Sequence, residues 1–313
     1  SDVLKKYLLQ RYERLDEIFK ELLSKSSVVG NIFSAELLEN PFQIINAAEK
    51  LSDIEKISNL IEHCDNKTYA FETEDVHNLI LSNVSNEQQK EWHNILALYF
   101  QRILSRENKR KNLLTTDRTI FLVYSIASHF KSAAEYQSAL PYYLELVSQY
   151  SKLCDYTNKL ETIKNIQFIL NQIELEENEL DKMEIDIMIW RADCYKGLGQ
   201  YTKAYELYNE LLEFIDDEVY SQLLIDAYYN KSYCLYMMGK VIEAQEILYL
   251  ASKKFNLREN HKKDYIRIIS LLASICDSTN DSTTQRKFYI ESLTYYRENR
   301  YEKEYYELLK MAS

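Results

Sequence analysis

Glycine and proline are scarce in this chain of 313 residues, which contains four Gly and two Pro. Average proteins use about 7% Gly and about 5% Pro, so the scarcity indicates few sharp loops and a nearly all-helical chain. It also excludes the glycine-rich loops that cradle phosphates. Neither Gly-x-x-x-x-Gly-Lys-Ser/Thr nor Gly-x-Gly-x-x-Gly occurs, so we expect no nucleotide chemistry in these residues.

Metal-ligating and catalytic patterns are absent from the sequence as well. The five cysteines, Cys64, Cys154, Cys194, Cys234 and Cys276, are odd in number and form no Cys-x-x-Cys pair, which argues against a disulfide framework. The five His are scattered. With no nucleophile–base pair and no convergent carboxylates, we predict no enzyme activity, no catalytic residue, no metal and no cofactor.

No apolar run reaches the length of a transmembrane helix, and no signal peptide precedes the first predicted helix. Together with the unpaired cysteines, this predicts a protein of the reducing cytoplasm, away from membranes. The chain begins Ser-Asp-Val without a Met, which indicates a piece of a longer protein.

Positive charge is in deficit: 38 Lys and Arg against 49 Asp and Glu give a net charge of −11. One acidic run occupies residues 174–186 and is interpreted as a solvated helix face and turn. A net-acidic protein binds a phosphate backbone poorly, so the composition argues against DNA as a partner.

What the chain does have is a repeated pattern of small and large residues around a turn. The matched positions are Ala192, Tyr195, Gly199, Ala204 and Tyr208 in one copy, and Ser232, Leu235, Gly239, Ala244 and Leu248 in the next. Small residues allow two helices to touch, and Gly ends the first of them. Such hairpins cannot bury an apolar face alone, so copies stack into a solenoid.

These copies resemble tetratricopeptide repeats, with further copies around Ala134 and Asn280. The resemblance implies a right-handed α-solenoid of helical hairpins over residues 111–313, with a capping helix from Tyr301 to Met311. The sequence departs from the family in its period near forty and in the missing Pro that usually ends the second helix. The longer gap before Ala192 leaves room for an intermediate helical pair.

The first 110 residues follow a different pattern. Amphipathic helices are predicted at Leu15–Leu23 and Ile44–Ile61, with a short helix capped by Ser34 between them. Tyr69–Phe71 alternates like a strand, and Trp92–Phe100 forms another helix. This order predicts a small winged-helix-like domain with a connector helix over residues 1–110. The complete fold class is therefore all-α.

The segment Leu22-Leu-Ser-Lys-Ser-Ser-Val-Val-Gly-Asn-Ile-Phe-Ser34, followed by Tyr69-Ala-Phe71 and Trp92-His93, resembles the winged-helix segment of signal-transduction ATPases with numerous domains (STAND proteins). In that family, tetratricopeptide-like sensor repeats follow this segment. Thr73 stands where the family commonly has His, and the nucleotide-binding core is absent from the sequence. The resemblance implies a regulatory half, with the ATPase in the same full-length polypeptide and a protein or peptide ligand.

The predicted helix Ile44–Ile61 would be the DNA-reading helix of a winged-helix domain. It carries Glu49, Asp53 and Glu55 and no Arg, whereas reading of base edges requires donors that face the groove. We therefore expect this domain to pack against a neighbouring domain and not to bind DNA.

The first helices of stacked hairpins line a concave surface. Residues at i, i+4 and i+7 project together from one of them. In the copy around Gly239 these positions include Tyr229, Tyr233 and Tyr236. The equivalent positions include Asp193 and Lys196 in the copy around Gly199, and Tyr124 and Lys131 in the copy around Ala134. Aromatic residues beside a few charges suit a peptide, so these seven residues are the predicted partner-binding site. Packing within the repeats is the alternative for any one of the tyrosines.

Two functional hypotheses follow. The first is a non-catalytic sensor and protein-interaction module that regulates an attached ATPase or effector by binding a peptide or protein on the concave face. The alternative is a free-standing tetratricopeptide-repeat scaffold or a peptide-responsive transcriptional regulator. A P-loop encoded upstream of Ser1 would favour the first.

The double variant Tyr229→Ala with Tyr233→Ala separates ligand contact from packing. If both rings line the binding surface, the response to a partner is lost while the thermal unfolding midpoint, followed by circular dichroism, changes little. Loss of folding would instead assign both rings to the core.

Overall fold

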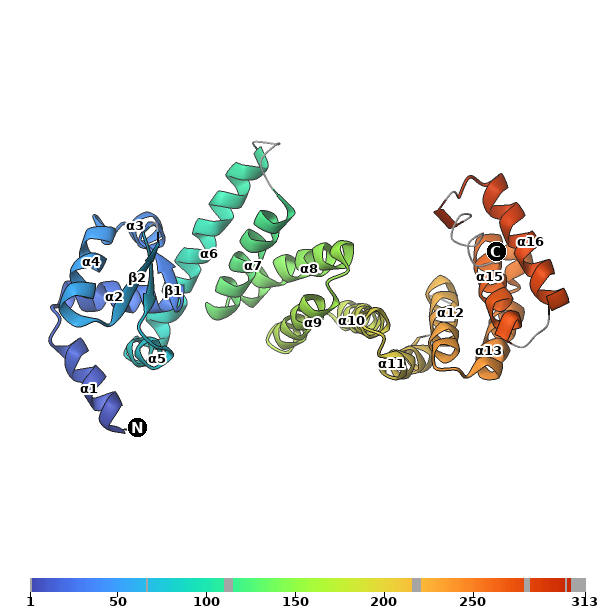
Figure 1. Ribbon diagram of the computed structural model, residues 1–313, viewed down its shortest axis with the longest axis horizontal. Coiled ribbons are helices and arrows are strands. Elements are labelled where there is room, and N and C mark those ends of the chain that lie inside the picture. The colour runs from blue at the N-terminus through green and yellow to red at the C-terminus, as the bar shows by residue number, and fades with distance from the viewer. Residues whose placement is uncertain are drawn as a thin grey trace. The chain divides into compact units, whose positions relative to one another are not determined.

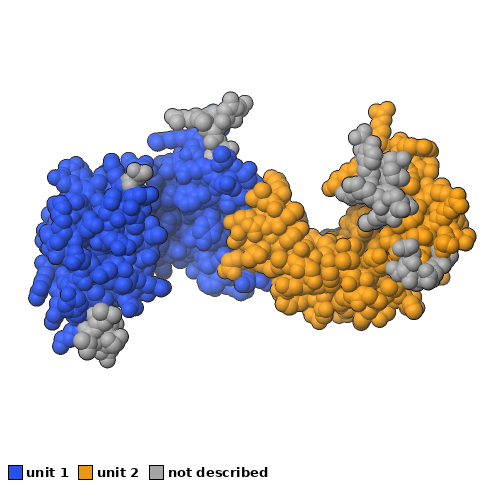
Figure 2. Space-filling model, viewed as in Figure 1, with its two compact units in different colours: residues 1–149, 164–174 blue, residues 150–163, 175–313 orange. Residues whose placement is uncertain are grey.

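A computed structural model describes residues 2–65, 67–109, 115–215, 221–278, 282–301 and 303–304 of the chain (Figure 1). Within these ranges the chain forms sixteen helices and three short strands. The expected all-α solenoid of helical hairpins is therefore confirmed. The chain packs as two compact units, residues 1–149 with 164–174 and residues 150–163 with 175–313 (Figure 2).

The first unit begins with a compact core of short helices around a three-stranded sheet. Its elements are α1 (Asp2–Glu13), α2 (Glu17–Val29), β1 (Ile32–Ser34), α3 (Glu36–Phe42), α4 (Ala47–Ser58), β2 (Ile61–Asp65), β3 (Thr68–Phe71) and α5 (Glu74–Ser82). The strands pair antiparallel in the order β1-β3-β2. Leu22, Leu38, Leu51 and Ile54, from α2, α3 and α4, are buried in one apolar cluster with Phe33 of β1. The helices thus cover the small sheet.

Several features of this core differ from the sequence prediction: α4 begins at Ala47 and not at Ile44, and Ile32–Ser34 forms β1, which was not predicted as a strand. The helix expected over Ile44–Ile61 ends at Ser58, because Asn59 adopts a left-handed conformation with φ 47° and caps it. Ile61 then begins β2, which the sequence did not reveal. Four of the five β2 side chains are exposed, so β2 lacks the apolar alternation by which a half-buried strand is recognised. β3 matches the predicted strand at Tyr69–Phe71.

A long hairpin links the core to the repeats. It consists of α6 (Asn86–Lys109) and α7 (Thr116–Ser132), which pack along each other. α6 also packs on α2 and α3 of the core. α8 (Tyr136–Leu153) and α9 (Tyr156–Leu170) follow.

The second unit contains three helical hairpins. Its elements are α10 (Glu177–Gly197), α11 (Tyr201–Phe214), α12 (Ser221–Met237), α13 (Val241–Lys254), the short α14 (Leu257–Asn260), α15 (Lys262–Ser278) and α16 (Ser282–Glu298). Most of the residues expected at the helix contacts are buried: Ala192, Ala204, Tyr208, Ser232, Leu235, Ala244 and Leu248. Tyr195 is only partly buried. Asn280 and most of the predicted capping helix Tyr301–Met311 lie outside the described residues.

The longer gap before the Ala192 copy holds one helix, α9, and not the expected pair. Adding 65 to the bounds of α9, 156–170, gives 221–235, which lies within α12 (221–237). The three helices α7, α8 and α9 therefore correspond to α10, α11 and α12. The ring of Tyr156, at the start of α9, lies 2.3 Å from where a Cβ on Gly197 would be, so Gly197 lets α9 approach the end of α10.

The turns that follow α7, α10 and α12 share one hydrogen bond, from the N–H of Glu135, Gln200 or Lys240 to the carbonyl five residues earlier, at 2.9, 2.8 and 2.9 Å. The preceding residue has positive φ in each: Gly199 at 72°, Gly239 at 78° and Ala134 at 60°. A left-handed conformation costs a residue with a Cβ about 1 kcal/mol or more. Ala134 is thus the strained member.

Ala134→Gly is expected to stabilise the protein by about 1 kcal/mol, because Gly adopts this conformation without a Cβ clash. The converse change Gly199→Ala should destabilise it by a similar amount. Urea unfolding followed by circular dichroism measures both. A destabilised Ala134→Gly variant would contradict the assignment of strain to this turn.

Candidate functional site

The second unit carries five of the predicted site residues on the first helices of its hairpins. Asp193 and Lys196 lie on α10, and Tyr229, Tyr233 and Tyr236 lie on α12. All five are partly buried. Two polar clusters of side chains connect α10 to α12 and α12 to α15.

The first cluster centres on the Lys196 ammonium group. Its Nζ donates to Asp193 Oδ1 at 3.0 Å and to Asn230 Oδ1 of α12 at 2.9 Å. The hydroxyl of Tyr208 donates to the same Asp193 oxygen at 2.8 Å. Burial raises the pKa of Tyr208, with a further contribution from Asp193, so the hydroxyl keeps its proton and remains a donor. The side chains of Lys196 and Asp193 stay 27% and 38% exposed.

The second cluster centres on Arg267 of α15. Its guanidinium pairs with Asp226 of α12 at 2.7 Å and with Asp264 at 3.6 Å. It also covers the ring of Tyr229, 4.1 Å from the ring centroid. Burial, ahead of the other causes, raises the pKa of Tyr229. Tyr229 can therefore reach a partner only if Arg267 moves aside.

The other two tyrosines of α12 differ in surroundings. The ring of Tyr233 meets Tyr201 edge-on, with centroids 6.3 Å apart. Burial raises the pKa of Tyr233 as well. Tyr236 is half-buried beside the apolar cluster that α12 shares with α13 and α15. The three rings thus share one helix face without forming one aromatic patch.

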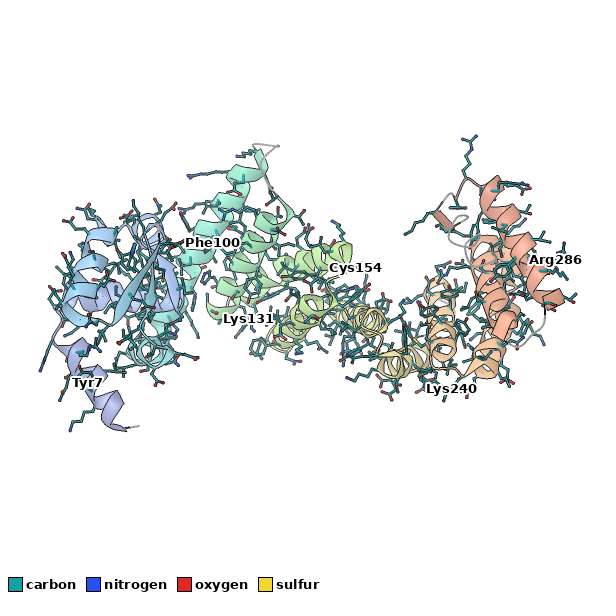
Figure 3. The ribbon with its side chains drawn as sticks, viewed as in Figure 1. Tyr7, Phe100, Lys131, Cys154, Lys240 and Arg286 are labelled. Atoms are coloured by element: carbon teal, nitrogen blue, oxygen red, sulfur yellow. The ribbon has the colours of Figure 1, made fainter. Side chains whose placement is uncertain are left out.

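The remaining predicted residues, Tyr124 and Lys131, lie on α7 in the first unit. Lys131 Nζ donates to Asn165 Oδ1 of α9 at 2.6 Å and lies 4.9 Å from the ring centroid of Phe168 (Lys131 is labelled in Figure 3). Tyr124 is 51% exposed. The Lys131–Asn165 pair spans 34 residues, as the Lys196–Asn230 pair does. The same polar link therefore occurs once in each unit.

Sequence reasoning missed Asn165, Asn230, Asp226 and Arg267. It followed aromatic spacing along single helices, whereas these residues act between helices. The Lys-to-Asn spacing of 34 residues, present twice, was the available signal.

Reactive thiols, metal binding and membrane crossing find little support in the part of the chain that the structure describes. Burial raises the pKa of both Cys194 and Cys234 to about 11, so both thiols stay protonated at neutral pH. No group of three or more His, Cys, Asp or Glu side chains in the described ranges could hold a metal ion. Among the helices described, none combines the length and the apolar character needed to cross a membrane.

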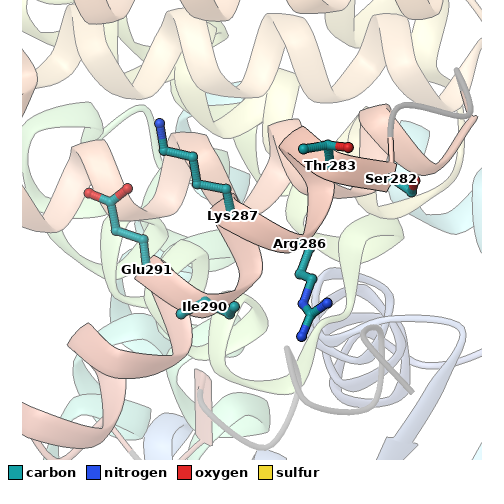
Figure 4. Close-up of a pocket in the computed structure, with 6 residues that line it drawn as sticks. All are labelled: Ser282, Thr283, Arg286, Lys287, Ile290 and Glu291. Carbon is teal, nitrogen blue, oxygen red and sulfur yellow. The ribbon is translucent and has the colours of Figure 1, made fainter.

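A cavity of about 710 Å³ lies along α16 (Figure 4). It is lined by Ser282, Thr283, Arg286, Lys287, Ile290 and Glu291. All six belong to one helix, so this lining does not bring groups from different elements together. None of them is a predicted site residue.

No protein-family model matches the sequence, and no curated protein matches it. Several solved helical-repeat structures are similar. Nearly identical TPR-like repeats from Podosopora anserina have a TM-score of 0.47 and 13% identity, covering 64% of this chain and 95% of that one. The apo form of the quorum sensor NprR from B. thuringiensis has a TM-score of 0.37 and 15% identity, covering 86% and 79%.

A STAND protein with a tetratricopeptide repeat sensor from Pyrococcus horikoshii has a TM-score of 0.34 and 14% identity, covering 91% of this chain and 58% of that one. These similarities concern the backbone fold of helical-repeat proteins.

Tyr208→Phe removes the hydrogen bond to Asp193 and keeps the ring. We expect a loss of about 1–2 kcal/mol of unfolding free energy, because the bond ends on a carboxylate. Tyr195→Phe is the control, since no described residue bonds the Tyr195 hydroxyl, and it should change stability by less than about 0.5 kcal/mol. Urea unfolding at pH 7 compares them. Equal effects would show that the bond to Asp193 adds nothing.

Proposed function

We propose that this protein is a non-catalytic protein-interaction module that binds a peptide or a protein segment on the first helices of its hairpins. The observation that carries the proposal is the Lys196–Asn230 link with Asp193 and Tyr208. It holds polar groups from three helices in fixed positions while leaving Lys196 and Asp193 partly exposed.

Fixed and partly exposed groups suit binding. Ordering of side chains at an interface costs about 0.5–1.5 kcal/mol each, and side chains already held by hydrogen bonds avoid most of this cost. Tyr and Arg are also enriched among the residues that contribute most to interfaces. Tyr233, Tyr236 and Arg267 are of these types, on α12 and the neighbouring α15.

The orientation of Asn230 indicates what the site can bind. A Lys ammonium only donates hydrogen bonds, so the oxygen of the Asn230 amide must face Lys196, as it does at 2.9 Å. The amide nitrogen then points elsewhere, and it has no hydrogen-bond partner among the described residues. It is available to donate to a main-chain carbonyl of an extended ligand, while Asp193 can accept from a main-chain N–H.

The regulatory role is the finer part of the proposal. Residues 1–110 form a winged-helix-like domain with its connector helix, and residues 111–313 form a sensor that regulates an ATPase or effector, carried in the same full-length polypeptide in the cytoplasm. The exposed surface of α4 supports a protein contact for the first domain. It presents Glu49, Lys56 and Ile57, and Ile57 is 68% exposed. A surface with both signs of charge and an exposed apolar side chain suits a protein partner better than DNA.

The test begins with selection of binders from a random dodecapeptide library on the wild-type protein, followed by calorimetry with the best binder. Lys196→Ala with Asn230→Ala should weaken binding at least about tenfold, which corresponds to 1.4 kcal/mol. Each change removes a group that the site offers to the ligand.

The second unit supplies a matched control. Lys231 Nζ donates to Asn209 Oδ1 at 2.6 Å, a bond of the same chemistry between α12 and α11. Lys231→Ala with Asn209→Ala should change the affinity less than about twofold. Equal losses in both double variants, or no loss in the first, would refute the proposed surface.

A further inference from the structure

Two histidines that are distant in the sequence meet in the hairpin between the compact core and the repeats. His93 of α6 and His129 of α7 place their Nδ1 atoms 3.0 Å apart, with ring centroids at 5.2 Å. The ring of Phe100, which is labelled in Figure 3, stacks on His129 at 5.7 Å and an interplanar angle of 7°. The pair thus lies between two helices with an aromatic ring against it.

The contact limits how many protons the pair can hold. A neutral imidazole has one N–H donor and one acceptor nitrogen, so an N–H of one ring can face the lone pair of the other. One added proton, placed on an outer nitrogen, preserves this bond. Two added protons put N–H against N–H and two positive charges side by side in a partly buried place, which is repulsive.

Burial lowers the pKa of His93 to about 4. Burial, and then the charge on His93, lowers the pKa of His129 to about 3. No described carboxylate contributes to either shift. Lys25 of the neighbouring α2 lies over the Trp92 ring at 5.7 Å. Within the hairpin itself, Glu107 of α6 is paired with Arg118 of α7 at 3.3 Å.

We propose that His93 and His129 form a two-proton latch. In the neutral state their hydrogen bond holds α6 against α7, and double protonation releases the hairpin and separates the core from the first repeat helix. This device is independent of the proposed peptide-binding surface. Its ligand is the proton.

The direction of the pH dependence follows from the lowered pKa values. Groups whose pKa in the closed hairpin lies below the ordinary 6.5 stabilise it fully above pH 6.5 and lose this contribution as the pH falls toward 4 and 3. Between these limits each histidine shifts the closed-to-open ratio about tenfold per pH unit. The pair together shifts it up to about a hundredfold per unit, which makes the response steep.

Hydrogen–deuterium exchange between pH 7.5 and pH 4.5, corrected for the intrinsic exchange rate, tests the latch on the full chain. We expect α6 and α7 to lose protection below about pH 6 while α12 and α13 retain theirs. Trp92 lies beside His93 and meets Phe42 of α3 edge-on at 6.3 Å. In a Trp190→Phe background its fluorescence should therefore change over the same pH range.

Two variants make the test specific. His93→Leu with His129→Leu removes both titrating groups, so α6 and α7 should keep their protection at low pH. His63→Gln changes an exposed histidine of β2 and should leave the wild-type response intact. If the double leucine variant does not fold, nitrogen-15 NMR of the wild-type imidazoles replaces it, and one Nδ1–H shared by two neutral rings at pH 6 is expected.

The proposal is overturned if α6 and α7 keep their protection at pH 4.5 in the wild type. Loss of protection in all helices together would also overturn it, because that is global acid unfolding. So would an unchanged pH response in the double leucine variant, or imidazoles that titrate near pH 6.5 in the NMR spectra.

Discussion

The close contact between the two helices of each hairpin is the constraint on which the second unit depends. Ala192 and Ala204 in one copy, and Ser232 and Ala244 in the next, are all fully buried, because only small side chains let helix backbones approach so closely. A hairpin of this kind still has an apolar face to cover, and neighbouring hairpins cover it. Stacking thus fixes which helices become neighbours and which side chains can meet between them.

The polar clusters are a consequence of that stacking. The first helices of successive hairpins lie close enough for Lys196 to reach Asn230 and for Arg267 to reach Asp226. These bonds cross between helices at partly exposed positions, where each charge keeps contact with water and has a partner. Exposed ion pairs of this kind add little stability. Their fixed positions matter more for recognition, since a partner meets groups that are already ordered.

The α6–α7 hairpin meets a different physical requirement. It joins a compact core with a small sheet to a stack of helices, and its interior contains two imidazoles where the hairpins of the second unit contain small and aliphatic residues. Polar groups that are shielded from water need partners, and these two partly buried imidazoles hydrogen-bond to each other. Their mutual bond requires that at least one nitrogen at the contact carries no proton.

The repeat spacing determined the helix pairs, their turns and the buried small residues, because these depend on neighbours within about four residues and on one turn conformation. It also placed Asp193 and Lys196 on one helix. Only the tertiary structure decided that a single helix fills the longer gap, that Arg267 covers Tyr229, and that His93 meets His129. These contacts join residues 36 to 38 positions apart, or a helix to its neighbour, and they depend on how helices pack. The spacing of residues along one helix does not determine which side chains of other helices pack against it.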